Sequence, residues 1–275
     1  VTFSIFNLIL ITSRLVGLVL IYVLNVSFSI TNILIIYGFT GLLFFVFSIY
    51  KIYILNNKKF TISYKNSELS IFLIFKNSYY YGVSTLCYLI ILSGSILLFK
   101  YFFGNETTGY FQAAYNIFLI ITLPFSVIIQ KYFLPQIHKW FYQNRSMLNY
   151  FLYYGNLSCI ISSITFVFIT YNYSSNIIYY IYGENYESSL IFLNFLLILF
   201  PLRILTILNG SILNTGENYK NKTFYYIETL VIFILSFTVL SYYYNINGAL
   251  LSLIVTELYL LTRYFFHLKK IFFTK

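Results

Sequence analysis

Residues 189–213 read SLIFLNFLLILFPLRILTILNGSIL, an apolar stretch in which Arg203 is the one charged residue. A helix that crosses a membrane needs about 20 consecutive apolar residues, and this stretch has that length and composition. A charge at membrane depth costs about 2.5–3.5 kcal/mol on insertion, so Arg203 is expected to face a cavity or a partner. The stretch therefore predicts a membrane helix with a candidate functional position inside it.

The same pattern recurs along the whole chain. Apolar runs of similar length predict eight transmembrane helices, at about 1–23, 30–51, 78–100, 109–131, 149–171, 189–213, 223–242 and 247–267. Hydrophobic residues make up 60% of the sequence and charged residues 9%, far below the roughly 25% charged content of soluble domains. The predicted fold class is therefore an all-α polytopic membrane protein.

Lysine and arginine alternate between the predicted connections. Most of the 17 basic residues lie in or beside connections 52–77, 132–148 and 214–222 and the tail 268–275. The other connections, at 24–29, 101–108, 172–188 and 243–246, carry none. By the positive-inside rule, the basic connections and both termini are expected on the cytoplasmic side. The net charge is +10, and most of the basic residues would then lie beside anionic lipid headgroups. For this reason nucleic acid is not an expected partner.

The basic connection 132–148 also has an amphipathic character. Trp140, Phe141 and Tyr142 stand beside Lys139 and Arg145. This mixture is typical of a helix that lies in the membrane interface, so a short surface helix is expected here.

The sequence carries few of the groups that catalysis needs. It has no aspartate, and neither His138 nor His267 has a carboxylate or cysteine at ligand spacing. Cys87 and Cys159 fall inside predicted spans, where small buried hydrophobes are common. No nucleotide-binding glycine motif is present. We therefore expect no enzyme activity, no cofactor and no metal, and a membrane transporter is the simpler interpretation.

Five ionisable residues fall inside the predicted spans, namely Arg14, Lys100, Arg203, Glu228 and Glu257. Arg14, Arg203 and Glu257 lie near the midplane of their spans. Arginine at this depth predicts a cationic cavity for a phosphate-bearing substrate, because the guanidinium fork matches phosphate oxygens. Arg203, Arg14 and Lys100 are accordingly the candidate substrate-binding residues.

Each of these residues also has a structural alternative. Arg203 can pair with Glu257, and Arg14 and Lys100 can extend their side chains toward headgroups or toward another part of the protein. Glu228 is expected to be either a partner for polar groups at a helix end or a proton carrier. Glu257 is either a helix-pairing residue or a coupling-ion residue.

Two segments of the chain share one plan. Residues 2–51 and 223–272 each contain two spans joined by an uncharged outer turn, and each begins with Thr-Phe. A duplication predicts that 78–275 is a six-helix C-terminal lobe with a cytoplasmic tail. The stretch 52–77 is then a basic cytoplasmic linker, and 1–51 the last two helices of an N-terminal lobe whose first four spans precede Val1.

Several short motifs occur in a fixed order over residues 78–268. They are GNETTGYFQAAY at 104–115, FLPQI at 133–137, YGENY at 182–186, LNTG at 213–216, NGAL at 247–250 and Thr256-Glu257. In this order and spacing the chain resembles the Wzx-type O-antigen or polysaccharide repeat-unit flippases, within the multidrug/oligosaccharidyl-lipid/polysaccharide exporter superfamily.

The resemblance implies translocation of undecaprenyl-pyrophosphate-linked oligosaccharide repeat units across the bacterial inner membrane, for O-antigen or capsule synthesis. It implies a polyprenyl pyrophosphate substrate, and a polysaccharide polymerase and a chain-length regulator as partners besides membrane lipids. A multidrug or lipid II exporter of the same superfamily, and a membrane polysaccharide polymerase, are the alternatives. A polymerase usually needs a large outer loop with arginines, and the connection 172–188 contains no cation.

Overall fold

The computed structural model describes residues 12–13, 16–17, 30–57, 71–216 and 218–273, and every secondary-structure element among them is helical. The predicted all-α class is therefore confirmed. The chain divides into two units, Val1–Glu68 and Leu69–Lys275, and each is described by itself.

Unit Val1–Glu68 contains helix α2, Ile30–Asn57, which begins where the sequence predicts and continues beyond residue 51. Within it, the stretch Leu34–Phe47 is apolar. The predicted span 1–23 lies outside the described residues except at 12–13 and 16–17, which are helical. Arg14 also lies outside the described residues.

Unit Leu69–Lys275 contains the long helices. Its elements are α3 (Ile71–Val127), a π-helical turn (Ile128–Phe133), α4 (Leu134–Gln143), α5 (Arg145–Tyr182), a 3₁₀ turn (Glu184–Tyr186), α6 (Ser189–Ile212) and α7 (Asn218–Phe273). The predicted linker 52–77 is partly helical, because α2 continues to Asn57 and α3 begins at Ile71.

The predicted count of eight transmembrane helices is wrong for the part of the chain that the structure describes. Four helices there are long and apolar enough to cross a membrane, over Ser78–Gln143, Arg145–Tyr182, Ser189–Ile212 and Asn218–Ile271. Two of the four missing helices are accounted for by α3 and α7, each of which contains two of the predicted spans joined through one non-helical residue, Gly104 in α3 and Asn245 in α7. The other two are the predicted spans 1–23 and 30–51, which belong to the unit Val1–Glu68. By helix length and hydropathy, this is a multi-pass membrane protein.

Helix α6 is the central element of this unit, and it contacts α3, α5 and α7. Half of its most apolar 18-residue stretch is buried, whereas only 6% of the most apolar stretch of α5 is. The core around it is rich in aromatic side chains, and the rings of Phe99 and Phe111 stack with their centroids 3.9 Å apart. The polar residues of α6 are therefore held inside the bundle.

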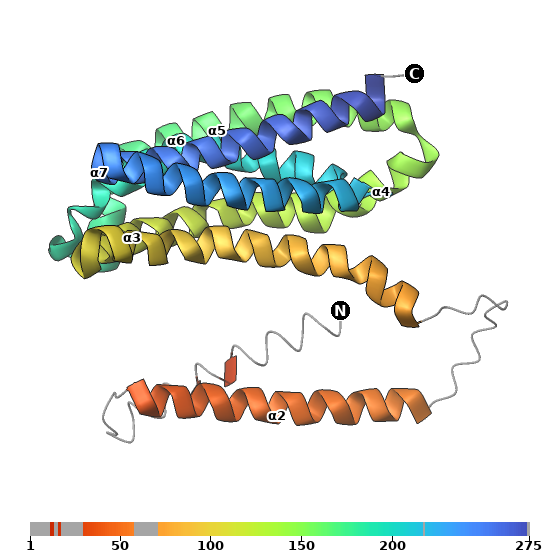
Figure 1. Cartoon of the computed structure of the whole chain (residues 1–275), viewed down its shortest axis with the longest axis horizontal. Helices are drawn as coiled ribbons and strands as arrows, with labels where there is room; N and C mark the ends of the chain where they lie inside the picture. The colour runs from red at the N-terminus through yellow and green to blue at the C-terminus, as the bar shows by residue number, and fades with distance from the viewer. Residues whose placement is uncertain (1–11, 14–15, 18–29, 58–70, 217, 274–275) are drawn as a thin grey trace. The chain divides into compact units, whose positions relative to one another are not determined.

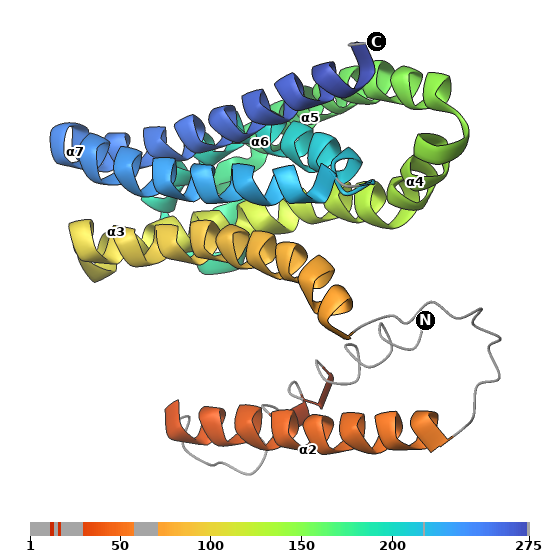
Figure 2. The same cartoon turned by 45° about the vertical axis from the view of Figure 1, so that its right-hand side comes forward.

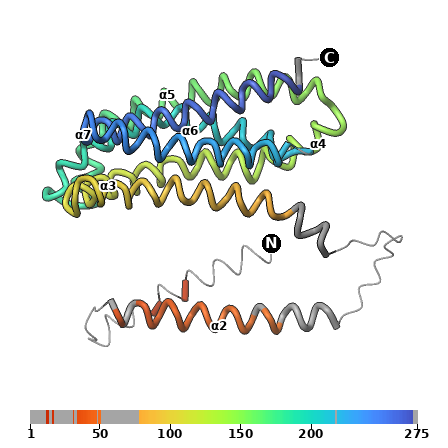
Figure 3. The backbone as a smooth tube through the Cα atoms, in the orientation of Figure 1, coloured from red at the N-terminus to blue at the C-terminus, as the bar shows by residue number. Residues whose placement is uncertain are grey.

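The connections of this unit gather at its two ends (Figure 1; Figure 2). The bends inside α3 and α7 and the turn between α5 and α6 lie at one end, and the backbone trace shows α3 and α7 folding back there (Figure 3). Helix α4 and the C-terminal end of α7 lie at the other end. The second end carries the basic connections, and its placement in the cytoplasm stays a prediction.

The surface helix expected in 132–148 corresponds to α4, Leu134–Gln143, so a helix is present there. Ile137 is fully buried, whereas Lys139 is exposed, as an amphipathic helix requires. Pro135 lies in the first turn, where its missing N–H is tolerated. Asn144 then caps α5, because its side-chain oxygen accepts a hydrogen bond from the Met147 N–H at 3.1 Å. Whether α4 lies on the inner membrane surface stays a prediction.

Gly104 makes the bend of α3 possible. Its φ of 80° and ψ of −178° fall in a backbone region that is essentially restricted to glycine. Gly104 and Gly109 both belong to the motif at 104–115, but Gly109 is helical and has open space where a Cβ would lie. Within one motif, then, the first glycine is required by the backbone and the second is not.

Gly104→Ala is expected to destabilise the protein by about 1–3 kcal/mol, because alanine is strained in this conformation. Thermal unfolding of the purified chain in detergent measures the effect. Gly109→Ala is the matched control, and it should leave the melting temperature unchanged or slightly raised because alanine favours helix. Equal melting temperatures for the two variants would show that the bend does not depend on glycine.

Candidate functional site

A cavity of about 470 Å³ opens inside unit Leu69–Lys275, between α3, α6 and the start of α7. Most of the described residues that line it are polar, and none of them is a carboxylate. The lining polar residues are Tyr81, Ser84, Thr85, Tyr88, Thr122, Ser126, Gln130, Arg203, Thr206, Ser211, Asn214, Lys222 and Tyr226. The cavity therefore presents two cations and many uncharged hydrogen-bonding groups.

Arg203 lies in this wall and is 6% exposed. Its guanidinium donates from Nη1 to the Glu257 carboxylate and from Nη2 to the Tyr88 hydroxyl. The guanidinium carbon also lies 4.8 Å from the centroid of the Tyr88 ring, in the range of a cation–π contact. These contacts join α6 to α7 and α3, and they fix the guanidinium at the cavity wall.

Glu257 supplies the negative charge that a buried guanidinium requires. It is 8% exposed, and its Oε1 accepts from Arg203. Its Oε2 is buried without a hydrogen-bond partner among the described residues. The expected pairing of Arg203 with Glu257 is thus present, with one carboxylate oxygen left unsatisfied, an arrangement that costs free energy.

Lys222 is a cavity residue that the sequence alone did not single out, because it lies in a connection used only to assign topology. In the structure it belongs to the first turns of α7, and its Nζ donates to the Gly210 carbonyl at 2.9 Å and to Asn214 Oδ1 at 2.8 Å. The available signal was its position one residue before a predicted span. A lysine there can reach back to the end of the preceding helix.

The α3 wall of the cavity is a stripe of hydroxyl groups. Tyr81, Ser84, Thr85 and Tyr88 follow the i, i+3, i+4, i+7 spacing that places side chains on one helix face. This stripe is the second feature that sequence reasoning missed, although its periodicity is visible within the predicted span 78–100. It offers hydrogen-bonding groups opposite the cations of α6 and α7.

Lys100 and Arg14 are not brought to this cavity by the described part of the structure. Lys100 is exposed and is not among the cavity-lining residues. It lies 12 residues after Tyr88 on a continuous helix, a rise of about 18 Å, so it cannot reach the same position. Arg14 lies outside the described residues.

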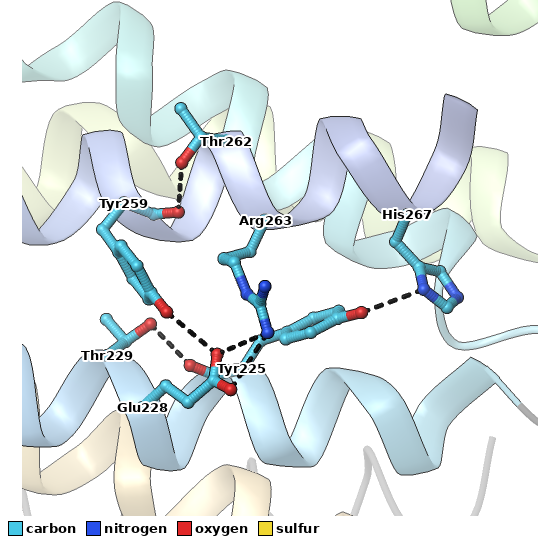
Figure 4. A network of polar contacts seen from close by, with 7 residues as sticks. All are labelled: Tyr225, Glu228, Thr229, Tyr259, Thr262, Arg263 and His267. Atoms are coloured by element: carbon cyan, nitrogen blue, oxygen red, sulfur yellow. Dashed lines mark hydrogen bonds and ion pairs between the residues drawn. The ribbon is translucent and has the colours of Figure 1, made fainter. Parts of the chain in front are cut away.

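Glu228 belongs to a separate network that joins the two halves of α7 (Figure 4). Its carboxylate accepts from Arg263 Nη2 at 2.9–3.0 Å and from the Tyr259 hydroxyl at 3.0 Å. The Arg263 guanidinium carbon lies 4.7 Å from the centroid of the Tyr225 ring, and the Tyr225 hydroxyl hydrogen-bonds to His267 Nδ1 at 2.9 Å. In these contacts Glu228 is a partner of Arg263 and Tyr259, and whether it also carries protons stays untested.

Prolines and a π-helical turn shape the cavity wall locally. Pro201 lies two residues before Arg203 in α6, and Pro124 lies in α3 just before the π-helical turn Ile128–Phe133. Proline removes a backbone hydrogen bond, and π-helical turns are frequent at functional sites. Gln130, from this turn, lines the cavity.

The cavity thus combines a buried arginine paired with a carboxylate, a second cation held by neutral acceptors, and a stripe of hydroxyl groups. No family model, curated protein or solved structure matches the chain, so the site is interpreted from its own geometry.

Proposed function

We propose that the chain translocates undecaprenyl-pyrophosphate-linked oligosaccharide repeat units across the bacterial inner membrane, for O-antigen or capsule synthesis. The observation that carries this proposal is the cavity of about 470 Å³ lined by Arg203 and Lys222 and by no described carboxylate. Such a cavity inside membrane-length helices attracts a phosphate group, because guanidinium and ammonium groups are the usual phosphate binders of proteins. The hydroxyl stripe on α3 supplies partners for sugar hydroxyl groups.

The Arg203–Glu257 pair provides a means of coupling binding to movement. A pyrophosphate carries more negative charge than the single carboxylate, so it competes with Glu257 for the guanidinium. Glu257 is on α7 and Arg203 on α6, so breaking this pair releases a contact between two helices. A substrate that binds one arrangement of the helices more tightly than the other shifts the population between inward-open and outward-open states.

The same proposal assigns two membrane crossings each to α3 and α7. With α5 and α6, the unit Leu69–Lys275 then crosses the membrane six times, with α4 and the C-terminus in the cytoplasm. Ser146 and Ser175 are exposed near opposite ends of α5. They are therefore suitable positions for a topology measurement.

Single cysteines at Ser146 and Ser175 are expected to react with a membrane-impermeant maleimide from opposite sides of the membrane. Cys87 and Cys159 are first replaced by alanine, and that cysteine-free chain is the control. In intact spheroplasts, the cysteine at 175 should be labelled and the one at 146 only after permeabilisation. Labelling of both before permeabilisation would refute the proposed topology.

The function itself is tested by removing the gene and locating the lipid-linked repeat units. Loss of a translocator leaves complete repeat units on the inner leaflet, so we expect them to accumulate there while surface polysaccharide disappears. Accumulation on the outer leaflet would instead indicate loss of a polymerase. Normal surface polysaccharide with a defect in lipid II or drug export would reject the proposal.

A further inference from the structure

We propose that Lys222 forms an inner phosphate-binding position, separate from Arg203, that the substrate contacts first on its way into the cavity. This inference rests on the proposed function and assigns a substrate-binding role to a residue outside the predicted membrane spans. It is drawn from the hydrogen bonds of the Lys222 ammonium and from its place in the cavity.

The Lys222 ammonium is held in place by the end of α6. Among the last carbonyls of α6, those of Asn209, Ser211 and Ile212 accept backbone N–H groups of residues 213–215 at 3.1–3.3 Å. The remaining carbonyl, that of Gly210, accepts from Lys222 Nζ. Lysine at a helix C-terminus also interacts favourably with the negative end of the helix dipole. The ammonium is therefore fixed in position before any substrate arrives.

This arrangement leaves binding capacity on the ammonium. An ammonium group has three N–H donors, and two of them go to the Gly210 carbonyl and Asn214 Oδ1. Both acceptors are uncharged, and no described carboxylate lies within ion-pair distance of Lys222. Arg203, in contrast, is neutralised by Glu257. An incoming anion can thus bind at Lys222 without first displacing a carboxylate.

The two cations lie at different heights of one cavity. Gly210, which Lys222 contacts, follows Arg203 by seven residues on α6, a rise of about 10 Å along the helix axis. The Lys222 ammonium, held at the Gly210 carbonyl, therefore lies nearer the C-terminal end of α6 than the Arg203 backbone does. Lys222 lies toward the proposed inner end, so the order of contact from the cytoplasmic leaflet is Lys222 and then Arg203.

Binding of farnesyl pyrophosphate, a short soluble probe, to the purified chain in detergent tests this assignment, with farnesol as the uncharged comparison. Lys222→Gln keeps a hydrogen-bond donor but removes the charge, and it should weaken pyrophosphate binding about tenfold, because a charge-assisted hydrogen bond is replaced by a weaker neutral donor. Lys222→Arg should retain most of the affinity. Lys139→Gln, which removes an exposed lysine of α4, is the matched control and should bind like the original chain.

A second measurement needs no variant. Farnesyl pyrophosphate should protect Lys222 from acetylation by an amine-reactive reagent, read by mass spectrometry, while Lys139 remains reactive. Unchanged affinity of Lys222→Gln together with no protection of Lys222 would show that Lys222 only caps α6, and would overturn the inference. In that case, weaker binding by a variant that lacks Arg203 would leave the proposed function intact. Equal binding of farnesol and farnesyl pyrophosphate by the original chain would reject both.

Discussion

Arg203→Ala is expected to abolish surface polysaccharide in cells. The variant removes the planar donor that can form two charge-assisted hydrogen bonds to a phosphate, each worth about 1.5–3 kcal/mol, so binding should weaken at least about 100-fold. Arg203→Lys should restore part of the export, because a point charge replaces a bidentate fork. Immunoblotting of surface polysaccharide, with the amount of protein in the membrane measured in parallel, provides the comparison.

The single alanine variant also leaves Glu257 buried without its partner, so a paired variant is needed to separate binding from folding. Arg203→Gln with Glu257→Gln replaces both charges with amides of similar size. This variant should reach the membrane in normal amounts and still export no polysaccharide. Normal export by the paired variant would show that the guanidinium does not bind the substrate.

Glu257→Ala is expected to destabilise the protein by about 3–5 kcal/mol, because removal of one partner leaves a buried charge uncompensated. Arg203 is 6% exposed, and its other hydrogen-bond partner, the Tyr88 hydroxyl, carries no charge. Thermal or denaturant unfolding in detergent measures the loss. The exposed Glu187 is the matched control, since Glu187→Ala should change stability by no more than about 0.5 kcal/mol.

Replacing the pair together distinguishes a charge effect from a packing effect. A buried ion pair exchanged for apolar residues of similar volume is often neutral or stabilising by about 1–4 kcal/mol. Arg203→Met with Glu257→Met should therefore unfold near the temperature of the original chain or above it. A Glu257→Ala variant as stable as the original chain would mean that water or other groups already compensate Arg203.

The helices are the part of the fold that the sequence predicts well, because a membrane-crossing helix requires a long apolar stretch whatever it packs against. The predicted span 189–213 differs by one residue from α6, Ser189–Ile212. The span 149–171 is too short, since α5 covers Arg145–Tyr182. Its ends are rich in polar and tyrosine residues, which end the apolar pattern without ending the helix. Part of the error in the helix count arises because α3 and α7 each continue through a bend at a single residue, Gly104 in α3 and Asn245 in α7.

The site was predictable only where a residue breaks the apolar pattern at a recognisable depth. Arg203 and Glu257 satisfy that condition, and matching their depths is enough to predict the pair. Lys222 and Tyr88 do not satisfy it, because their roles depend on how α7 and α3 pack against α6. Lys100 does break the pattern, but its place along α3 puts it far from Tyr88 and the cavity. The position of a residue within its predicted span therefore identifies buried charges. Which of them line the cavity depends in addition on how the helices pack.

Translocation of a fluorescent undecaprenyl-pyrophosphate-linked oligosaccharide in proteoliposomes tests the central claim most directly. Reduction of the fluorophore by dithionite from outside reports how fast the lipid exchanges between the leaflets. The original chain is expected to exchange it faster than protein-free vesicles, and the Arg203→Gln, Glu257→Gln chain should exchange it at the protein-free rate. Equal rates for the original and the paired variant chains, or no exchange above the protein-free rate by either, would contradict the account.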